Sequence, residues 1–178
     1  MPIQWPTRSL PPAHRSSARS APATTLCCTI NEANVPEVGS VDPERFTSLV
    51  ELSAIALTVE VAGEPVGFCL VLPLGAGYDS VNYRWFDDRY DDVMYLDRVA
   101  FDARFQRRGL GTLLYDDVER RVAETGVAGL TLEVNVDPPN PPSLTFHDRR
   151  GYVEVGRQDT PYGIVVTMMR KDLNRPTS

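Results

Sequence analysis

The chain has 178 residues, of which 42% are apolar and 24% are charged, and its net charge of −6 accompanies an isoelectric point near 4.9. This size and composition are typical of a single globular domain that buries a core without metal or disulfide support. The acidic balance argues against nucleic acid and against an anionic membrane as partners, because both bind basic surfaces, and it favours a cationic substrate such as an amine.

The cysteines predict a reducing compartment. Cys27, Cys28 and Cys69 are odd in number, and an adjacent pair fits neither a disulfide framework nor the ligand spacing of a zinc site. We therefore expect a cytoplasmic protein without a bound metal. No apolar run approaches the length that crosses a membrane.

The first 23 residues are rich in proline and arginine and contain no acidic residue. Such a composition cannot form a core. These residues also lack the apolar segment of a secretion signal, and their prolines would interrupt an amphipathic transit helix. We interpret residues 1–23 as a disordered arm, or as the product of an upstream start codon. One domain should follow over residues 24–172, with a frayed end over residues 173–178.

The first half of the domain is predicted to begin with a strand over Thr25 to Ile30. Asp42-Pro43-Glu44 combines a helix N-cap, a proline suited to the first helical position and an acid in the first turn, so a short helix should follow. Two strands, Ala54 to Val61 and Val66 to Leu72, are joined by a hairpin turn. The second strand is almost continuously apolar, which indicates burial on both faces, with Cys69 as a small core residue.

Residues 73–92 form a long connection. Loops of this length are usually functional or disordered, and three tyrosines, a tryptophan and a phenylalanine are too many aromatic residues for disorder. We expect a binding lid, and the alternative is an aromatic cluster that packs on the sheet. Aromatic faces and carboxylates suit an ammonium group. The candidates for that contact are Tyr78, Tyr83, Trp85, Asp87 and Asp88.

The second half alternates strands with helices. The predicted strands are Val93 to Phe101, Leu130 to Val136, Tyr152 to Arg157 and Ile164 to Arg170, and the predicted helices run from Gly109 to near Gly126 and from Ser143 to Arg150. Strict alternation after Leu130 places Thr131, Glu133 and Asn135 on one face of their strand. Because helices and strands intermix, we expect an α/β fold with a mixed sheet covered on both faces.

The turn before the long helix reads Gln106-Arg107-Arg108-Gly109-Leu110-Gly111 and follows an apolar strand. The first N–H groups of a helix lack intrahelical partners and carry the positive end of its dipole, so glycines and arginines at this point suit a pyrophosphate. The same residues are compatible with a purely structural turn and a solvated pair of arginines.

Two other phosphate-binding folds compete for this turn. In a dinucleotide-binding fold, Glu133 would be the ribose-binding acid, because it lies roughly twenty residues beyond the glycines. However, Leu114 occupies the third glycine position of that fingerprint, and hairpins stand where parallel crossovers are needed. A P-loop lacks its Lys-Ser or Lys-Thr pair. The sequence therefore disfavours both folds.

Two segments carry a family resemblance. Gln106-x-x-Gly109-x-Gly111, after the strand ending at Phe101, resembles the acetyl-coenzyme A motif of the GNAT superfamily of N-acetyltransferases. Asn140 to Tyr152 is similar to a second GNAT segment, Asn-x-x-Ala-x-x-Phe-Tyr-x-x-x-Gly-Phe. The resemblance covers residues 24–172 and is most convincing over residues 93–156. It implies a mostly antiparallel sheet of about six to seven strands with helices on both faces, in which the fourth and fifth strands part to admit the acyl thioester.

The resemblance also implies contacts with acetyl-coenzyme A (acetyl-CoA). Backbone groups of Val99 and Phe101 would hold the pantetheine arm, Asn140 would touch it, and the turn would bind the pyrophosphate. The full set of cofactor candidates is Val99, Phe101, Gln106, Arg107, Arg108, Gly109, Leu110, Gly111, Thr112 and Asn140.

Three residues are candidates for the chemistry. His147 stands where many family members place a tyrosine that protonates the departing thiolate, and imidazole can perform that step near neutral pH. Its alternative role is structural. Asp97 and Glu133 are candidates for the base that deprotonates the amine. Either can instead be an ion-pair partner, Asp97 for Arg98 or Arg84, and solvent often serves as the base in this family.

The favoured function is direct transfer of an acetyl group from acetyl-CoA to a primary amine of a small molecule or peptide, and a homodimer is compatible with it. The alternative is a catalytically inactive module that binds or senses acyl-coenzyme A. The substrate-binding candidates are Tyr83, Trp85, Asp88 and Asn135.

Overall fold

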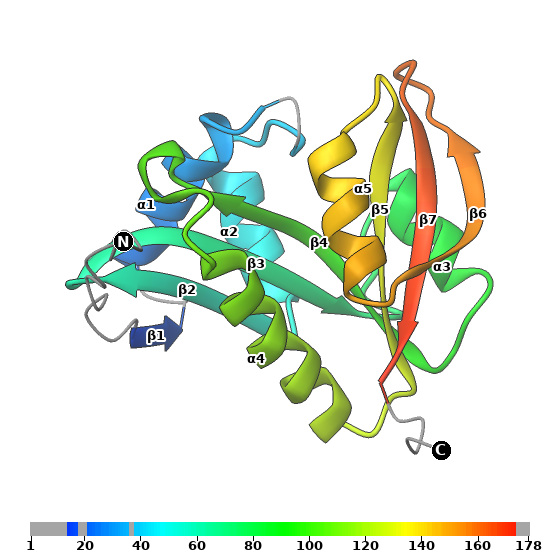
Figure 1. Cartoon of the computed structure of the whole chain (residues 1–178), viewed down its shortest axis with the longest axis horizontal. Helices are drawn as coiled ribbons and strands as arrows, with labels where there is room; N and C mark the ends of the chain where they lie inside the picture. Colours follow the sequence, from blue (N-terminus) through cyan, green and yellow to red (C-terminus); the bar gives the residue numbers. More distant parts are fainter. Residues whose placement is uncertain (1–13, 18–20, 36–37, 174–178) are drawn as a thin grey trace, which may run out of the picture.

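The computed structural model describes residues 14–17, 21–35 and 38–173, and in this part of the chain seven strands form one sheet (Figure 1). The order across the sheet is β1-β2-β3-β4-β5-β7-β6. The strands are β1 (His14–Ser17), β2 (Ile55–Val61), β3 (Glu64–Pro73), β4 (Val93–Phe101), β5 (Gly129–Asp137), β6 (Val153–Asp159) and β7 (Val165–Asp172). The helices are α1 (Ala21–Glu32), α2 (Pro43–Leu52), α3 (Val81–Asp87), α4 (Leu110–Glu124) and α5 (Pro141–Arg149), with a 3-10 turn η1 (Ala103–Phe105).

The sheet parts between β4 and β5. Every other pair of neighbouring strands is antiparallel, whereas β4 and β5 are parallel. They pair at their first three residues only, from Val93 with Gly129 to Tyr95 with Thr131. Beyond that point β4 stays paired with β3 and β5 stays paired with β7. Figure 1 shows the two strands diverging, so their carboxyl-terminal halves border an opening within the sheet.

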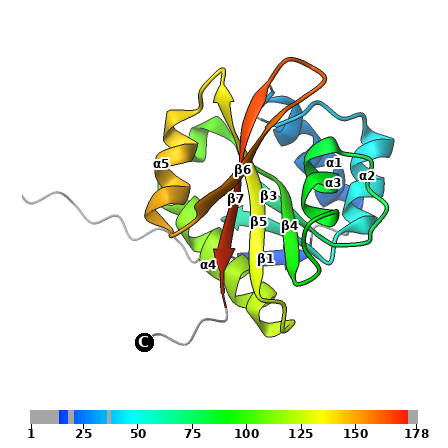
Figure 2. The same cartoon turned by 90° about the vertical axis from the view of Figure 1, so that its right-hand side faces the viewer.

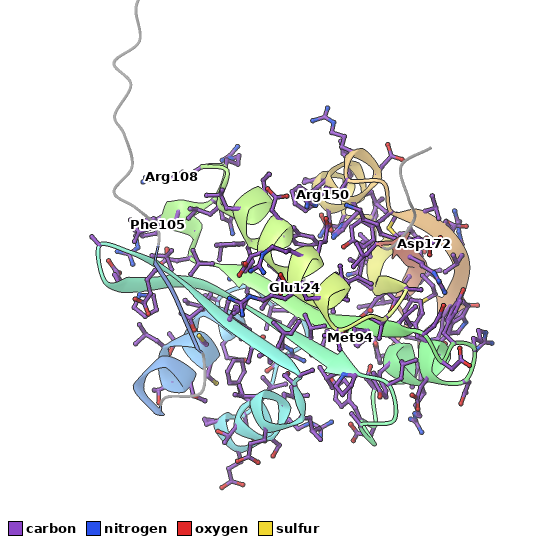
Figure 3. The ribbon with its side chains drawn as sticks, turned by 90° about the horizontal axis from the view of Figure 1, so that it is seen from below. Met94, Phe105, Arg108, Glu124, Arg150 and Asp172 are labelled. Carbon is purple, nitrogen blue, oxygen red and sulfur yellow. The ribbon has the colours of Figure 1, made fainter. Side chains whose placement is uncertain are left out.

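The helices cover the two faces of the sheet in separate groups. α1, α2 and α3 lie on one face, and α4 and α5 lie on the other (Figures 2 and 3). Phe46 and Tyr95 belong to the core beneath the first group. Leu114 and Leu132 belong to the core beneath the second. The opening between β4 and β5 therefore joins two helix layers that the rest of the sheet keeps apart.

The structure confirms the predicted fold class, a mixed and mostly antiparallel sheet with helices on both faces. β4 has the predicted bounds. α2 begins at Pro43, and the side chain of Asp42 accepts a hydrogen bond from the Arg45 N–H at 2.7 Å. α4 begins after Gly109, whose φ of 81° is the left-handed conformation that glycine adopts at little cost.

The predicted strand over Thr25 to Ile30 is wrong, because this segment belongs to α1. Its β-branched residues favour an extended conformation locally. However, Cys27, Ile30 and Asn31 are buried at helical spacing, and α1 packs on β3 and α2. Tertiary burial thus overrides the local preference.

The predicted arm over residues 1–23 is also wrong in part. His14–Ser17 form β1, which pairs with β2, and α1 begins at Ala21. Strand pairing uses main-chain groups, so a segment that cannot form a core can still extend the edge of a sheet. Residues 1–13 and 18–20, and residues 174–178 of the frayed end predicted over 173–178, lie outside the described residues.

The connection over residues 73–92 contains a helix that the sequence analysis did not predict. α3 begins after Ser80, whose side chain accepts a hydrogen bond from the Tyr83 N–H. Tyr83 and Phe86 are fully buried, and their rings lie 5.5 and 5.8 Å from the ring of Tyr95. These aromatic residues pack on the sheet, which is the alternative to a lid.

All three cysteines are buried and free of disulfides. Cys27 lies on the buried side of α1, and Cys69 lies on β3 as the small core residue that the sequence predicts. Burial raises the pKa of the Cys27 thiol to about 11 and that of Cys69 to about 12. In the described residues, no helix combines the length and the apolar character that a membrane crossing requires.

Candidate active site

A cavity of about 460 Å³ lies where β4 and β5 part. Its wall includes Asp97 of β4, Glu133 of β5, and Tyr115 and His147 of α4 and α5. The segment between α1 and α2 contributes Asn34, Val38 and Gly39. The cavity thus brings together polar side chains from both layers of helices.

The turn that precedes α4 is suited to an anion. Arg107 and Gly109 have φ angles of 58° and 81°, and both turn residues, like Arg108 between them, are exposed. No side chain caps the helix, and its first intrahelical bond runs from the Leu113 N–H to the Gly109 carbonyl. The N–H groups before Leu113 are therefore available to a ligand.

Figure 3 shows Arg108 and Phe105 at this turn, and the Arg108 guanidinium lies 5.1 Å from the Phe105 ring. Gly111 lines the cavity, and a β-carbon there would lie in van der Waals contact with the Phe146 ring, at 3.9 Å. A β-carbon at Gly109 would meet no atom within 4 Å, so the chain is open to its surroundings at the start of α4.

Not all predicted cofactor residues lie in the cavity wall. Val99, Phe101, Gln106, Gly111 and Asn140 line it. Arg107, Arg108, Gly109, Leu110 and Thr112 belong to the adjoining turn and the first turn of α4.

Two of the lining residues carry structural bonds. The Phe101 carbonyl accepts from Asn34 Nδ2 at 3.0 Å and from Gln106 Nε2 at 3.3 Å. Asn140 caps α5, and its Oδ1 accepts from the Ser143 N–H at 3.2 Å. Gln106 and Asn140 therefore stabilise the backbone around the cavity through these hydrogen bonds.

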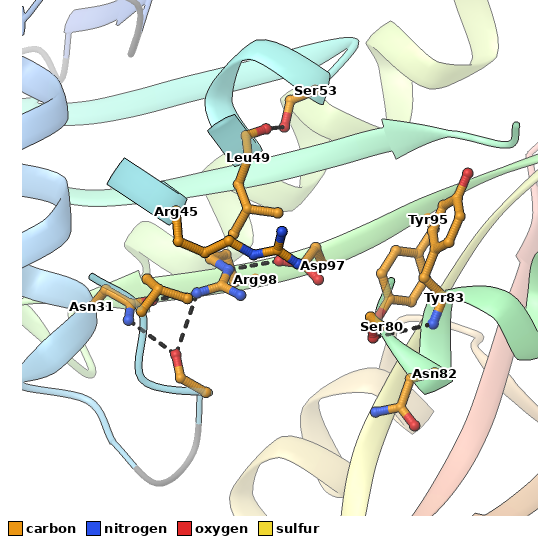
Figure 4. Close-up of polar contacts among 12 residues, drawn as sticks. Asn31, Arg45, Leu49, Ser53, Ser80, Asn82, Tyr83, Tyr95, Asp97 and Arg98 are labelled. Atoms are coloured by element: carbon orange, nitrogen blue, oxygen red, sulfur yellow. Dashed lines mark hydrogen bonds and ion pairs between the residues drawn. The ribbon is translucent and has the colours of Figure 1, made fainter. Parts of the chain in front are cut away.

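Asp97 is committed to an ion pair. Its Oδ2 lies 2.6 Å from Arg98 Nε, and both side chains are almost completely buried. Arg98 Nη1 also donates to Asn31 Oδ1 at 3.0 Å and to the Gly39 carbonyl at 3.3 Å, as Figure 4 shows. This network ties β4 to the segment after α1. It is the ion-pair alternative that the sequence analysis left open for Asp97.

Glu133 is held by two hydrogen-bond donors. Tyr95 Oη donates to Glu133 Oε2 at 2.7 Å, and Asn82 Nδ2 donates to Oε1 at 3.0 Å. Burial raises the pKa of the Glu133 carboxyl to about 7, the charge of Asp97 raises it further, and the two hydrogen bonds oppose them. A carboxyl that titrates near neutral pH can take up a proton and release it again, as a general base requires.

His147 is buried between a carbonyl and a phenol. Its Nδ1 lies 2.8 Å from the Ser143 carbonyl, which can only accept, so Nδ1 carries the proton. Nε2 lies 2.7 Å from Tyr115 Oη and accepts its hydrogen in the neutral ring. Burial is the largest influence on the pKa of His147 and lowers it, the Ser143 hydrogen bond and the Glu119 charge oppose this, and the Arg150 charge adds to it, so that the pKa is lowered overall. The histidine is therefore neutral near pH 7, and its own proton faces the helix backbone.

The structure does not bring Tyr83, Trp85 and Asp88 into the cavity wall, whereas Asn135 lies in it. Tyr83 Oη donates to the Pro73 carbonyl at 2.8 Å. Trp85 packs against Gly156, where a β-carbon would lie 2.6 Å from the indole. Asp88 is exposed at the end of α3.

Sequence reasoning missed three residues that contact the candidate catalytic groups. Tyr115, Tyr95 and Asn82 each donate to a polar atom of His147 or Glu133. Tyr115 follows Leu114 on the buried side of α4, and a phenol there signals a hydrogen-bond partner within the core. Asn82 carries no such signal, because it lies 51 residues from Glu133 in the sequence.

A family model decides the family. The model described as "Acetyltransferase (GNAT) family" matches residues 28–152, well over half of the chain. The chain belongs to the GNAT family. A search of curated proteins found no match for it.

Solved structures with the same fold as this GNAT protein agree with that assignment. The ribosomal-protein-S18-alanine N-acetyltransferase of Escherichia coli is 17% identical, with a TM-score of 0.71 and 93% of this chain and 96% of that chain covered. Ard1 of Thermoplasma volcanium is 18% identical, with a TM-score of 0.72 and coverages of 90% and 97%. The yncA protein of Salmonella typhimurium, determined with its cofactor acetyl-CoA, is 15% identical, with a TM-score of 0.70 and coverages of 94% and 98%.

The family uses acetyl-CoA, and the residues of this chain fit that cofactor. The uncapped start of α4 with its two arginines suits the pyrophosphate, and the opening between β4 and β5 leads from there to Glu133 and Tyr115. Among the described residues, no group of three or more histidine, cysteine or acidic side chains is arranged to hold a metal ion.

Proposed function

We propose that this GNAT protein is an N-acetyltransferase that moves an acetyl group from acetyl-CoA directly to a primary amine of a small molecule or peptide. When bound, acetyl-CoA supplies an activated acetyl carbonyl and a thiolate leaving group. The observation that carries the proposal is Glu133, a carboxyl with a pKa of about 7 in the wall of the cavity between β4 and β5.

Glu133 acts as the base in this proposal. An ammonium group has no lone pair, so it must lose a proton before it can attack. Tyr95 and Asn82 each occupy one oxygen of the Glu133 carboxylate. A carboxylate has about four acceptor positions, so a position remains for the proton of the amine. Asp97 is less suited to this role, because Arg98 neutralises it.

Tyr115 presents the hydrogen for the departing sulfur in this proposal, with His147 acting through it. The neutral His147 ring has no proton on Nε2, whereas the Tyr115 hydroxyl carries one hydrogen and lies in the cavity wall. In this proposal the hydroxyl turns that hydrogen from His147 Nε2 to the sulfur when the thiolate forms. Burial raises the pKa of Tyr115, so the phenol donates a hydrogen bond to the thiolate rather than an entire proton. His147 is then a positioning residue.

The acceptor class is the less constrained part of the proposal. Glu133 in the cavity wall and the acidic balance of the chain favour a cationic amine. One structural neighbour is named for the alanine of a ribosomal protein, and another structure is described as that of "a putative phosphinothricin N-acetyltransferase". The proposal therefore includes both peptides and small molecules as acceptors of the acetyl group.

The test measures the release of free thiol from acetyl-CoA in the presence of each member of a library of primary amines. It compares the wild-type protein with Glu133→Gln. We expect turnover with at least one amine, and a loss of kcat in Glu133→Gln of roughly a hundredfold or more, with unchanged affinity for acetyl-CoA. Glu124→Gln is the matched control, because Glu124 is an exposed residue at the end of α4.

Two results would contradict the proposal. Wild-type turnover by Glu133→Gln would show that solvent or another group is the base. Tight binding of acetyl-CoA without thiol release for any amine would favour the alternative, a module that binds or senses acyl-coenzyme A.

A further inference from the structure

α3 reaches the candidate base although most of the helix lies away from the cavity. Asn82, in its first turn, donates to Glu133 Oε1 at 3.0 Å. Asn82 is 5% exposed. Figure 4 shows Asn82 and Tyr83 beside Tyr95, the second residue that donates to Glu133. α3 therefore supplies one of the two bonds that hold this carboxylate.

The orientation of the Asn82 amide is fixed from its other side. Gln158 of β6 donates from Nε2 to Asn82 Oδ1 at 2.7 Å. With its oxygen turned to Gln158, Asn82 presents its NH₂ group to Glu133. An ionised carboxylate can only accept hydrogen bonds, so this chain of donors, from Gln158 through Asn82, matches the charged form of Glu133.

Aromatic packing anchors α3 beside this chain of donors. Trp85 contacts Gly156, two residues before Gln158 on β6, at a distance that leaves no space for a β-carbon. The Arg89 guanidinium lies 4.2 Å from the centre of the Trp85 ring. Tyr83 Oη accepts from the Ala76 N–H at 2.8 Å, which ties the helix to the connection before it. Asn82 therefore projects from a helix fixed at several points.

We propose that α3 is a positioning element for the catalytic carboxylate, in which Asn82, oriented by Gln158, holds Glu133 in the direction and the charge state that accept the amine proton. This inference rests on the proposed function, because it takes Glu133 as the base. It assigns a role to residues 73–92 other than that of a lid.

The groups around Glu133 determine whether its pKa rises or falls when the Asn82 hydrogen bond is removed. Burial and the charge of Asp97 on β4 favour the protonated form, and the bonds from Tyr95 and Asn82 favour the ionised form. Tyr162, in the turn between β6 and β7, and Tyr115 of α4 also interact electrostatically with Glu133. Loss of the Asn82 bond removes a stabilising contact of the anion, so the pKa of Glu133 should rise.

The first experiment compares wild type with Asn82→Leu, which has a similar size and no amide. We expect the acidic limb of the pH profile of kcat/KM to move to higher pH. The loss should be roughly tenfold at pH 6.5 and less than about threefold at pH 9, where Glu133 is ionised in both proteins. Arg84→Ala is the matched control, because Arg84 is exposed on the same helix. It should leave the profile unchanged.

A carbon-13 titration of the Glu133 carboxyl in the same proteins provides a readout that does not need turnover. We expect the midpoint to rise in Asn82→Leu. Gln158→Leu leaves Asn82 in place but removes the hydrogen bond to Asn82 Oδ1. It should raise the Glu133 midpoint by a smaller amount, and it replaces Asn82→Leu in the experiment if that variant does not fold.

The outcomes separate this inference from the proposed function. An unchanged titration and an unchanged profile, with Glu133→Gln inactive, would overturn the role of α3 and leave Glu133 as the base. A raised titration midpoint without a change in the profile would support the contact with α3 and overturn the assignment of Glu133 as the base.

Discussion

The two ends of the cavity are built in different ways. At the end proposed for the cofactor, the candidate anion site consists of consecutive residues, Gln106 to Gly111, with exposed arginines and an uncapped helix start. At the acceptor end, Glu133 is enclosed by side chains from β4 and α3, which lie 38 and 51 residues away along the chain. The first site depends on the conformation of one turn, and the second depends on the packing of the whole domain.

This difference predicts different responses to substitution. Exposed side chains at the first end can change with little effect on stability, but a change in the backbone turn should abolish binding of the cofactor. At the second end, removal of a single polar atom should alter a pKa or leave a buried partner without its hydrogen bond. Three predictions sharpen or break this comparison.

The largest effect is expected for Gly109→Glu. It introduces a negative charge at the start of α4, where the pyrophosphate would meet the helix N-terminus, and calorimetry should show the affinity for acetyl-CoA reduced by roughly a hundredfold or more. Gly109→Ala is the control, because at φ 81° any side chain strains the turn without adding charge. If the Glu variant binds within about threefold of the Ala variant, the pyrophosphate does not lie here.

The second prediction concerns Tyr115 and His147. Tyr115→Phe removes only the hydroxyl, so kcat per folded molecule should fall by roughly ten to a hundredfold while the dissociation constant for acetyl-CoA changes little. His147→Phe should cause a similar loss. Because both changes interrupt one hydrogen bond, the double variant should be no slower than either single variant.

His147→Gln keeps a hydrogen-bond acceptor and should recover part of that activity. Multiplicative losses in the double variant would show that His147 acts independently of Tyr115. A Tyr115→Phe enzyme with the wild-type rate would exclude the phenol as the donor to sulfur.

The smallest effect is expected for the stability of Glu133→Gln. The pKa of Glu133 is raised on folding from its ordinary value near 4.5 to about 7, so the folded protein binds this proton more tightly than the unfolded chain. Stability associated with this group is therefore present below pH 4.5 and is lost as the pH rises to about 7. Glu133→Gln cannot lose it, so the variant should gain about 3 kcal/mol relative to wild type between pH 4.5 and pH 8.

Urea unfolding of both proteins at pH 5 and pH 8 measures this gain. The informative quantity is the change between pH 5 and pH 8 in the variant's free energy of unfolding relative to wild type. New contacts of the introduced amide shift this relative free energy by the same amount at both pH values and therefore cancel. An equal difference between variant and wild type at both pH values would show that Glu133 titrates normally.

The same contrast explains what the sequence predicts. β4, α4 and the turn between them follow from local patterns, namely an apolar strand, a Gly-x-Gly turn and a stripe of leucines. The sequence predicts a strand in place of α1, because Thr25, Thr29 and Ile30 favour extended backbone, and the helical spacing of its buried residues appears only in the structure. It predicts a loop in place of α3, because seven residues are too few for a helical period to appear.

At the candidate site, Glu133 and His147 could be selected from the sequence because each lies in a recognisable strand or motif. Their partners could not. Asn82 meets Glu133, and Tyr115 meets His147, only because β4 and β5 part while the helix layers close around the opening. Such contacts depend on tertiary structure, and no short segment contains them.

The buried cysteines have a practical consequence for all of these measurements. A thiol reagent that detects released coenzyme A reacts with thiolates, and Cys27 and Cys69 are inaccessible and hold their protons well above neutral pH. Cys28 is also buried, so the native protein contributes little background to the assay. When the domain unfolds, all three thiols become reactive together. The same reagent therefore counts product from folded enzyme and, without substrate, reports the rate at which each variant opens.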